Sequence, residues 1–506
     1  MPMARPLSAR DICDTMTMLR NLRCFIQDRS GFSALMYAIS ALPVLGLFGV
    51  ALDYGNTLTY RQKLDAAADA ASLQAVNTAR AQILANPNQS ESATQSAAVA
   101  AGLNAFKANA GTALSALDIN SPTVSLTISD SNPLTMTVTG TAKYNASVTT
   151  RFGKLFGASF KTFSFSGNSQ SATVMANYVG YYLLIDVSGS MGTPSTISGQ
   201  TALAKINPDD LSQYPGGCMF ACHFSGYKGY AYSRTNSASS TATAVANNYC
   251  AQPDTSSCIQ LRIDAVATAL KAFMSSAQAA ESYDNQIAVG LYPFIVNLFQ
   301  YYPASSASST LSTDLSASST AADCIPGLLD NGGATNTGLS SSCANSAKAN
   351  VTMGSGGTHI GNGFSQLYNL IPQPFGDGSS QDKRKPIVFL ITDGADDEQV
   401  YKSGSWSGSN HATTVASSYC KLFSDAGIAL YILNIPYQTI TNANASFAGN
   451  EDGYANSNIP YIAPSLQACV TSQSNYFQAD PYNPDSITDQ IQAMFAQSLQ
   501  ATRLVK

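Results

Sequence analysis

The sequence predicts an α/β protein in three parts: an N-terminal transmembrane helix, a small α+β membrane-proximal region, and a C-terminal doubly wound α/β domain with cysteine-rich insertions. Three observations support this: an uncharged apolar run at 31–52, alternating apolar and polar residues from Pro122, and alternating helices and apolar strands from Tyr178. The expected parts are 1–30 (cytoplasmic segment), 31–54 (transmembrane anchor), 55–110 (helical segment), 111–177 (β-rich membrane-proximal domain) and 178–506 (C-terminal domain), with insertions at 193–257 and 302–350.

The composition limits the classes of function. Charged residues make up 11% of the 506 residues, well below the usual quarter, and the formal net charge is −5. A chain without a basic excess lacks the electrostatic footprint of a nucleic-acid-binding protein. Three histidines leave little room for histidine-based catalysis or metal binding. The composition favours an extracytoplasmic protein with long polar loops.

The apolar run from Gly31 to Leu52 predicts a membrane anchor. Its 22 uncharged residues are long enough, as a helix, to cross a hydrocarbon core of about 30 Å. A cleaved signal peptide and a buried core helix are the alternatives, but no A-x-A site follows the run. The positive-inside tendency places the N-terminus in the cytoplasm and the rest outside the inner membrane, because five arginines precede the run: Arg5, Arg10, Arg20, Arg23 and Arg29.

The ten cysteines fall on both sides of the apolar run. Cys13 and Cys24 precede it, and the other eight follow residue 217. An even number of cysteines among polar loops is typical of disulfides in an oxidising compartment, although spacing does not give the pairing. The pattern Cys218-x₃-Cys222-His223 leaves zinc binding open as an alternative, but the extracytoplasmic prediction favours disulfides.

Between the anchor and the C-terminal domain the sequence predicts helices and then strands. Residues 60–86 are rich in alanine and other strong helix formers and end before Pro87, and a shorter helix is expected at 97–109. From Pro122 the segments TVSLTISD, LTMTVTGTAKYNASVTT and KTFSFSGNSQSATVMA alternate apolar with polar residues. They predict a small antiparallel sheet in which no residue indicates chemistry.

The anchor and the helix after it resemble the N-terminus of TadG-like proteins of Tad (Flp) pilus assembly systems. The resemblance covers about residues 28–80 and implies a role in pilus assembly. Related pilin-like proteins carry Glu five residues after the first Gly for processing, and Met36 stands there in this chain, so an anchor left uncleaved after Gly31 is expected. The matching residues are Pro43, Asp53, Tyr54, Arg61, Leu64, Asp65, Ala66 to Ala68, Asp69, Ala70 and Ala71.

The C-terminal domain alternates apolar strands with helices. Such alternation predicts a mostly parallel sheet covered on both faces, in which ligands bind at the carboxyl ends of the strands. Strands are expected in YVGYYLLID, QIAVGLYPFI, KPIVFLITD and IALYILNI, and helices in RIDAVATALKAFMSSA, THIGNGFSQLYNLI, HATTVASSYCKLFSDAG and SITDQIQAMFAQSLQ.

Hydroxyl and carboxylate residues follow two of these strands. Asp186, Ser188 and Ser190 follow the first, Asp393 follows the third, and Thr358 lies in a Gly-rich turn. A single D-x-S-x-S can be a simple polar turn, but three motifs in this order are a stronger signal. Their oxygen atoms suit a hard cation, and Mg²⁺, Mn²⁺ or Ca²⁺ is expected.

The same residues resemble the metal-ion-dependent adhesion site of von Willebrand A domains, which have a Rossmann-like fold. By this resemblance Ser188, Ser190 and Thr358 contact the metal directly, whereas Asp186 and Asp393 hold it partly through water. Neutral direct ligands leave the cation electron-poor, so the resemblance implies a protein partner that offers an acidic side chain, a pilus or envelope component.

Other polar residues near these motifs leave alternatives open. Asp396, Asp397 and Glu398 form either a second ion site or, more simply, a solvated rim. His359 is expected to pack locally at the start of a helix. The two insertions lengthen the path from Asp186 to Thr358 and are expected to form a disulfide-linked lobe beside the metal site.

These observations favour a non-enzymatic, membrane-anchored component of Tad-type pilus assembly or adhesion. One alternative is a surface adhesin extracted into or associated with the pilus. A lesser alternative is an enzyme or an accessory subunit, but the sequence contains no G-x-x-x-x-G-K-[ST], H-E-x-x-H or G-x-S-x-G motif.

Overall fold

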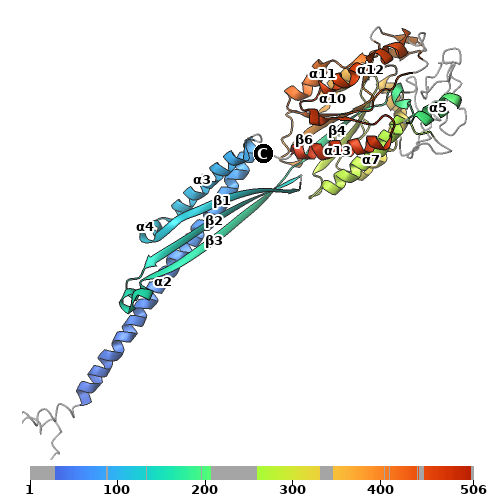
Figure 1. The fold of residues 1–506 in the computed structure, drawn as a ribbon. Helices are drawn as coiled ribbons and strands as arrows, with labels where there is room; N and C mark the ends of the chain where they lie inside the picture. Colours follow the sequence, from blue (N-terminus) through green and yellow to red (C-terminus); the bar gives the residue numbers. More distant parts are fainter. Residues whose placement is uncertain are drawn as a thin grey trace, which may run out of the picture. The chain divides into compact units, whose positions relative to one another are not determined.

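The computed structural model divides into two compact units, which are described separately. The first comprises Met1–Ile128 and Val138–Thr173, and the second comprises Ser129–Thr137 and Val174–Lys506. Figure 1 shows the elements of both. The structure describes residues 29–86, 89–132, 134–194, 196–206, 259–330, 343, 346–403, 405–408, 411–440, 443 and 449–502. Residues 1–28 of the expected cytoplasmic segment 1–30 lie outside this range, as do Cys13, Cys24, Cys218, Cys222, Cys250 and Cys258.

A single helix, α2 (Arg29–Ala85), contains both the expected anchor and the helix expected after it. The sequence predicts these as two segments, but Gly55 is the sole glycine and no proline occurs from Leu52 to Arg61, so nothing there ends the helix. Pro43 lies inside α2 without ending it. Among the described residues α2 is the one helix long and apolar enough to cross a membrane, and 6% of its apolar window is buried. A core helix of a soluble protein would be mostly buried.

Small side chains allow α2 to pack closely against α3 (Glu91–Ala110). Ala67, Ala71 and Ala75 of α2 are fully buried. At Gly102 of α3 an added Cβ would lie 2.9 Å from the Ala71 carbonyl oxygen, closer than real Cβ contacts occur. The alanine-rich pattern therefore serves close helix packing, and the short helix α4 (Ala113–Ala116) follows.

The expected β-rich region forms a three-stranded sheet with the order β1-β2-β3. The strands are β1 (Asp118–Asn132), β2 (Thr135–Thr149) and β3 (Thr162–Ala176). Side chains along β2 alternate between buried and more exposed over most of the strand, as the alternating sequence predicts. Two 3₁₀ turns, η1 (Gly153–Phe156) and η2 (Ala158–Phe160), connect β2 to β3.

The second unit contains a five-stranded parallel sheet with the order β12-β11-β6-β4-β5. The four long strands lie where the sequence predicts them, and the three-residue strand β12 adds an edge that it does not predict. The direction of winding reverses between β4 and β6, and the carboxyl ends of these neighbours meet at the reversal. The strands are β4 (Val179–Asp186), β5 (Ile287–Phe294), β6 (Lys385–Thr392), β11 (Ala429–Asn434) and β12 (Tyr476–Gln478).

Helices cover both faces of this sheet (Figure 1). On one face Tyr181 of β4 makes ring contacts with Phe273 of α7 (Arg262–Ala280) and Phe495 of α13 (Asp485–Thr502). On the other face Phe364 of α10 packs against Phe423 of α11. The helices of this second face are α10 (Ile360–Leu370), α11 (Ser417–Asp425) and α12 (Glu451–Gln467).

Short elements and two disulfides complete the second unit. Cys324–Cys343 lies within the expected insertion 302–350, and Cys420–Cys469 links α11 to the residues after α12. Most of the insertion 193–257 lies outside the described residues. The short elements are η3 (Gly189–Gly192), α5 (Ile197–Ile206), α8 (Leu315–Ala322), η4 (Ile325–Leu328), α9 (Ser346–Met353), η6 (Gln381–Lys383), β7 (Ala395–Asp396), β8 (Val400–Lys402), β9 (Ser405–Ser407), β10 (Thr413–Thr414) and η8 (Gln473–Asn475).

Two matched glycine substitutions test the packing of α2 against α3. Gly102→Ala places a methyl group against the Ala71 carbonyl and should lower the free energy of unfolding by about 1–3 kcal/mol. At Gly55 of α2 an added Cβ meets nothing within 4 Å, so Gly55→Ala should raise helix stability by up to about 1 kcal/mol. Urea unfolding of the detergent-solubilised chain, followed by far-UV circular dichroism, measures both. Equal effects of the two substitutions would contradict the packing described.

Candidate metal site

The expected metal-binding residues lie mainly at the reversal between β4 and β6. Asp186 is the last residue of β4, and Asp393 directly follows β6. Ile185 is paired with Ile391 in the register of the two strands, so the polar residues after them come to the same edge of the sheet. Both carboxylates are fully buried. This is the edge at which open parallel sheets bind ligands.

The Asp186 carboxylate is held by two hydrogen bonds. Its Oδ1 accepts the N–H of Ser188 at 2.9 Å, and its Oδ2 accepts the Thr392 hydroxyl at 2.7 Å. Thr392 Oγ1 in turn accepts the N–H of Gly394 at 2.9 Å. Gly394 has φ 89°, a backbone conformation that glycine adopts without strain. The Thr-Asp-Gly motif thus fixes Asp186 as well as placing Asp393, and the sequence alone does not predict this role of Thr392.

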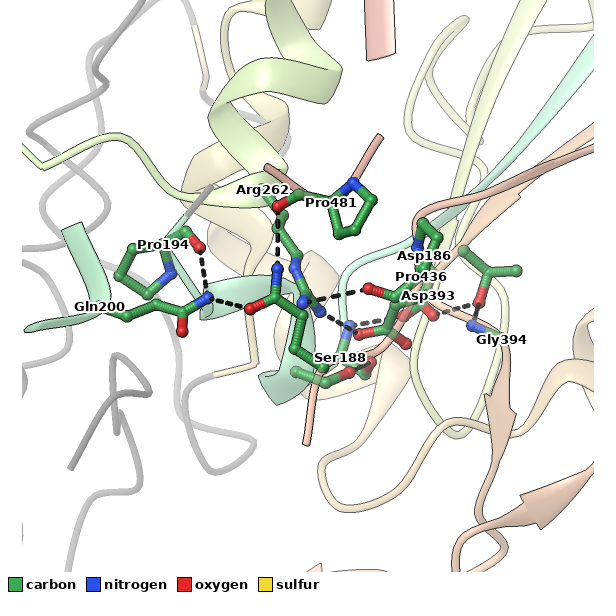
Figure 2. A network of polar contacts seen from close by, with 12 residues as sticks. Asp186, Ser188, Pro194, Gln200, Arg262, Asp393, Gly394, Pro436 and Pro481 are labelled. Atoms are coloured by element: carbon green, nitrogen blue, oxygen red, sulfur yellow. Dashed lines mark hydrogen bonds and ion pairs between the residues drawn. The ribbon is translucent and has the colours of Figure 1, made fainter. Parts of the chain in front are cut away.

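The two serines of the D-x-S-x-S motif lie side by side. Ser188 Oγ is 3.1 Å from Ser190 Oγ. Ser188 is buried and precedes the 3₁₀ turn η3, which carries Ser190. Figure 2 shows Ser188 beside the carboxylates of Asp186 and Asp393. The turn therefore directs hydroxyl oxygens to the carboxylate pair.

Arg262 adds a positive charge whose place at the site the sequence alone does not predict. Its Nη1 lies 3.3 Å from Asp393 Oδ2, and its Nη2 donates to the Pro436 carbonyl at 3.4 Å (Figure 2). The side chain is 5% exposed, and the guanidinium lies over the Tyr437 ring. Asp393 Oδ1, by contrast, is a buried oxygen without a hydrogen-bond partner. Arg262 thus satisfies one oxygen of Asp393 and leaves the other available.

The nearness of the two buried carboxylates makes it less favourable for both to be ionised. Burial raises the pKa of Asp186, and the nearby charge of Asp393 raises it further. Burial also raises the pKa of Asp393, but the Arg262 guanidinium and the Ser190 hydroxyl oppose that rise. Two buried acids with a single arginine leave an uncompensated negative charge at neutral pH when both are ionised. A bound cation would compensate it.

Asp330 links the Gly-rich turn that carries Thr358 to the residue after β4. The Asp330 N–H donates to the carbonyl of Val187, the residue after Asp186, at 2.9 Å. Asp330 Oδ2 accepts the N–H of Gly356 in the Gly-rich turn, also at 2.9 Å. The turn that carries Thr358 is thereby tied to the end of β4. Asp330 belongs to the expected insertion 302–350, and no sequence motif indicates this role.

The nearby acids do not form a solvated rim. Asp396 and Asp397 are buried, while Glu398 is exposed, so that interpretation is wrong for the first two. Asp396 Oδ1 caps α10 by accepting the Ile360 N–H at 2.9 Å. Burial raises the pKa of Asp396 to about 6, and burial together with the charge of Glu451 raises that of Asp397 to about 7.

Among the described residues no group of three or more His, Cys, Asp or Glu side chains is arranged to hold a metal, which gives no support for a second ion site. His359 lies at the N-cap of α10, where its Nε2 is 3.1 Å from the Gln399 carbonyl oxygen, as local packing requires.

The residues at the reversal fit a hard divalent cation. Asp393 Oδ1 is a buried carboxylate oxygen without a hydrogen-bond partner, Ser188 lies beside the carboxylate pair in Figure 2, and the Ser190 hydroxyl is 3.1 Å from that of Ser188. Carboxylate, hydroxyl and water oxygens are the ligands that Mg²⁺ and Mn²⁺ prefer. The set contains two carboxylates and is otherwise neutral, so it differs from sites built from three or more acidic or histidine ligands.

Comparison with protein families addresses the N-terminal part of the chain. Residues 31–81, about a tenth of the sequence, match the model of a family described as "Putative Flp pilus-assembly TadE/G-like". The N-terminal segment is TadE/G-like. The match confirms the resemblance predicted from residues 28–80. A search of curated proteins found no match.

Solved structures similar to the chain include pilus proteins and von Willebrand A domains. The pilus adhesin SpaC of Lactobacillus rhamnosus GG is 14% identical, with 75% of this chain and 35% of SpaC covered and a TM-score of 0.30. A von Willebrand factor type A protein of Catenulispora acidiphila is 11% identical, with 75% of this chain and 50% of that protein covered and a TM-score of 0.25. The von Willebrand domain of the type V pilus tip protein Mfa5 of Porphyromonas gingivalis is 10% identical, with 63% of this chain and 96% of that domain covered and a TM-score of 0.27.

This chain spans about a third of SpaC, and TM-scores this low carry no argument by themselves. The fold is instead argued from the sheet order and the motif positions of this chain. Later in the sequence than the TadE/G-like segment, the second unit is a doubly wound α/β domain with the D-x-S-x-S and T-D-G motifs at its switch point. The sequence predicts both this doubly wound sheet and these motif positions, which resemble those of von Willebrand A domains.

Two substitutions in α7 test the role of Arg262. Without divalent cations, Arg262→Gln leaves Asp393 buried without its counter-charge and should lower the free energy of unfolding by about 3–5 kcal/mol. Lys271 of the same helix pairs with Asp323 at 2.8 Å, and both side chains are more than 40% exposed, so Lys271→Gln should cost less than about 1 kcal/mol. Denaturant unfolding in a chelating buffer measures both. Similar costs would show that Arg262 is not a buried counter-charge.

Two acids with raised pKa values, Asp397 and Glu451, predict a pH dependence. Burial raises the pKa of Glu451, which lies 3.0 Å from His411 Nδ1, to about 7, as it does for Asp397. Between about pH 4.5 and 7 the folded chain holds protons that the unfolded chain has released. The free energy of unfolding should therefore fall as the pH rises through this window. Glu451→Gln should reduce the fall in the free energy of unfolding across this window by on the order of 2 kcal/mol. Urea unfolding at several pH values measures it, and an unchanged fall would contradict this assignment.

Proposed function

We propose that the chain is a non-enzymatic, membrane-anchored component of Tad/Flp-type pilus assembly or adhesion. Its C-terminal domain binds an acidic side chain of a pilus or envelope partner through a metal-ion-dependent adhesion site. The TadE/G-like segment supports the pilus association, and the α/β domain with its switch-point motifs supports the adhesive role.

The observation that carries the proposal is the set of oxygens at the switch point. Asp186, Asp393, Ser188 and Ser190 come together there, and Asp393 Oδ1 is buried without a partner. Most buried polar atoms in folded proteins have a hydrogen-bond partner, so an unpaired buried carboxylate oxygen calls for an explanation. A buried carboxylate oxygen without a partner, beside a second carboxylate, is the arrangement that a cation completes.

These residues would share the work at the site. Ser188, Ser190 and Thr358 would supply neutral oxygens, while Asp186 and Asp393 would supply charge. A bound Mg²⁺, Mn²⁺ or Ca²⁺ would act as a Lewis acid with a position left for a carboxylate of the partner. Arg262 also favours an acidic partner, because it adds a positive charge to that of the bound cation close to Asp393.

The proposed location is the inner membrane, crossed once by the apolar part of α2. The N-terminus lies in the cytoplasm, and the sheet units lie in the periplasm or at the surface. The two disulfides of the described residues support an oxidising compartment for the C-terminal domain. A partner in the envelope or on the pilus would then have access to the site.

Thermal unfolding with and without Mg²⁺ or Mn²⁺ tests the metal site. In the detergent-solubilised full chain, a cation at a hundred times its dissociation constant should stabilise the folded domain by about 2.7 kcal/mol. Asp186→Asn and Asp393→Asn should each abolish the rise in the unfolding midpoint, because each removes a charged oxygen ligand of a buried site.

Asp377 provides a matched control. It begins an exposed Asp-x-Ser turn in which its Oδ1 accepts the Ser379 N–H at 2.9 Å, the same local bond that Asp186 makes with Ser188. Asp377→Asn should leave the metal-dependent rise intact. The proposal fails if the parent protein shows no rise and isothermal titration detects no bound cation, or if all three substitutions act alike.

A further inference from the structure

An exposed apolar turn in the first unit has no role in the proposed metal site. Residues 151–161, RFGKLFGASFK, connect β2 to β3 and are called the aromatic turn below. Clustered large apolar side chains on a protein surface usually indicate a membrane or protein contact. In the aromatic turn four of them are exposed, and Leu155 is the most exposed at 75%: Phe152, Leu155, Phe156 and Phe160.

Asp53 of α2 fixes the aromatic turn against the helix. Its Oδ1 accepts the N–H of Arg151 at 3.0 Å, and its Oδ2 accepts those of Phe152 and Gly153 at 2.7 and 2.8 Å. The Thr150 hydroxyl donates to the Phe160 carbonyl at 2.7 Å and closes the turn. Hydrogen bonds to a carboxylate are stronger than neutral ones, so three of them hold the turn at a defined height along α2.

That height lies within the apolar run of the anchor. A Cβ at Gly46 would overlap the Phe156 ring, and a Cβ at Gly49 would lie 2.6 Å from Phe152 Cβ. The turn therefore packs along α2 from Asp53 back to Gly46. Gly46 lies about 9 Å, at 1.5 Å per residue, before the end of the apolar run at Leu52. If the run spans the bilayer, the tip of the turn lies below the membrane surface.

We propose that the aromatic turn inserts into the bilayer leaflet nearest Asp53 and fixes how deeply the anchor sits. This inference rests on the proposed membrane anchor. The immersion depth of about 5–10 Å is typical of amphipathic segments that lie at the acyl–headgroup boundary. The turn and the neighbouring face of α2 expose apolar side chains to the same surroundings, which makes lipid the occupant.

The basic residues of the aromatic turn support an anionic lipid surface. Arg151, Lys154 and Lys161 are exposed and alternate with the apolar side chains. Long basic side chains can extend to the headgroups while their apolar neighbours remain in the hydrocarbon. Basic groups at an anionic surface each contribute about 1 kcal/mol of attraction.

Tryptophan fluorescence in brominated lipid tests the insertion. The full chain carries one tryptophan, Trp406, so Trp406→Phe gives a silent background. Leu155→Trp and Phe156→Trp report on the turn, Leu42→Trp reports on the exposed apolar face of the anchor, and Leu84→Trp reports on the far end of α2. Each variant is reconstituted in vesicles of phosphatidylglycerol and phosphatidylcholine with or without brominated acyl chains.

Bromolipid should quench the two turn probes about as strongly as Leu42→Trp and should leave Leu84→Trp unchanged. The two probes guard against one substitution displacing the turn, and quenching of either supports insertion. If Leu42→Trp is quenched while both turn probes behave like Leu84→Trp, the anchor stands and the insertion is overturned. If Leu42→Trp is itself unquenched, the proposed membrane anchor fails, and the insertion fails with it.

Discussion

Two buried carboxylates at the ends of neighbouring parallel strands are the constraint on which the C-terminal domain depends. Asp186 and Asp393 are each fully buried, and burial of like charges is unfavourable unless other groups compensate it. Ser188, Thr392 and Arg262 provide part of that compensation through hydrogen bonds and one ion pair. The remaining negative charge and the unpartnered oxygen of Asp393 are what a divalent cation would satisfy. The sheet, its register and the loops serve to hold this pair together.

The sequence was sufficient for much of the fold and for the central residues of the site. The long strands and their polar ends follow from runs of apolar residues and local motifs, so β4, β6 and their acids could be placed in advance. Arg262 and Asp330 could not, because each reaches the site through contacts between residues far apart in the chain. Helix α12 was missed because Pro460 and Pro464 lie inside it, and proline usually ends a helix.

The first unit shows a similar use of a single acid. Asp53 is one of the residues on which the TadE/G-like resemblance rests, and the structure gives it a physical role. Its three backbone hydrogen bonds hold the turn between β2 and β3 beside the apolar part of α2. In both units a carboxylate organises loops that the hydrophobic pattern alone does not position. In the first unit the carboxylate is satisfied by the backbone, whereas in the second one carboxylate oxygen lacks a hydrogen-bond partner.

We propose above that Asp186 and Asp393 hold a cation that accepts a carboxylate. Electron paramagnetic and nuclear double resonance of Mn²⁺ added to the chelator-treated full chain, with ¹³C-labelled acetate as the carboxylate, tests it most directly. The account predicts a bound Mn²⁺ that Mg²⁺ displaces, that Asp186→Asn and Asp393→Asn abolish, and that couples to the acetate carbon. Mn²⁺ that remains free in the parent protein, or that binds equally to both variants, would contradict it.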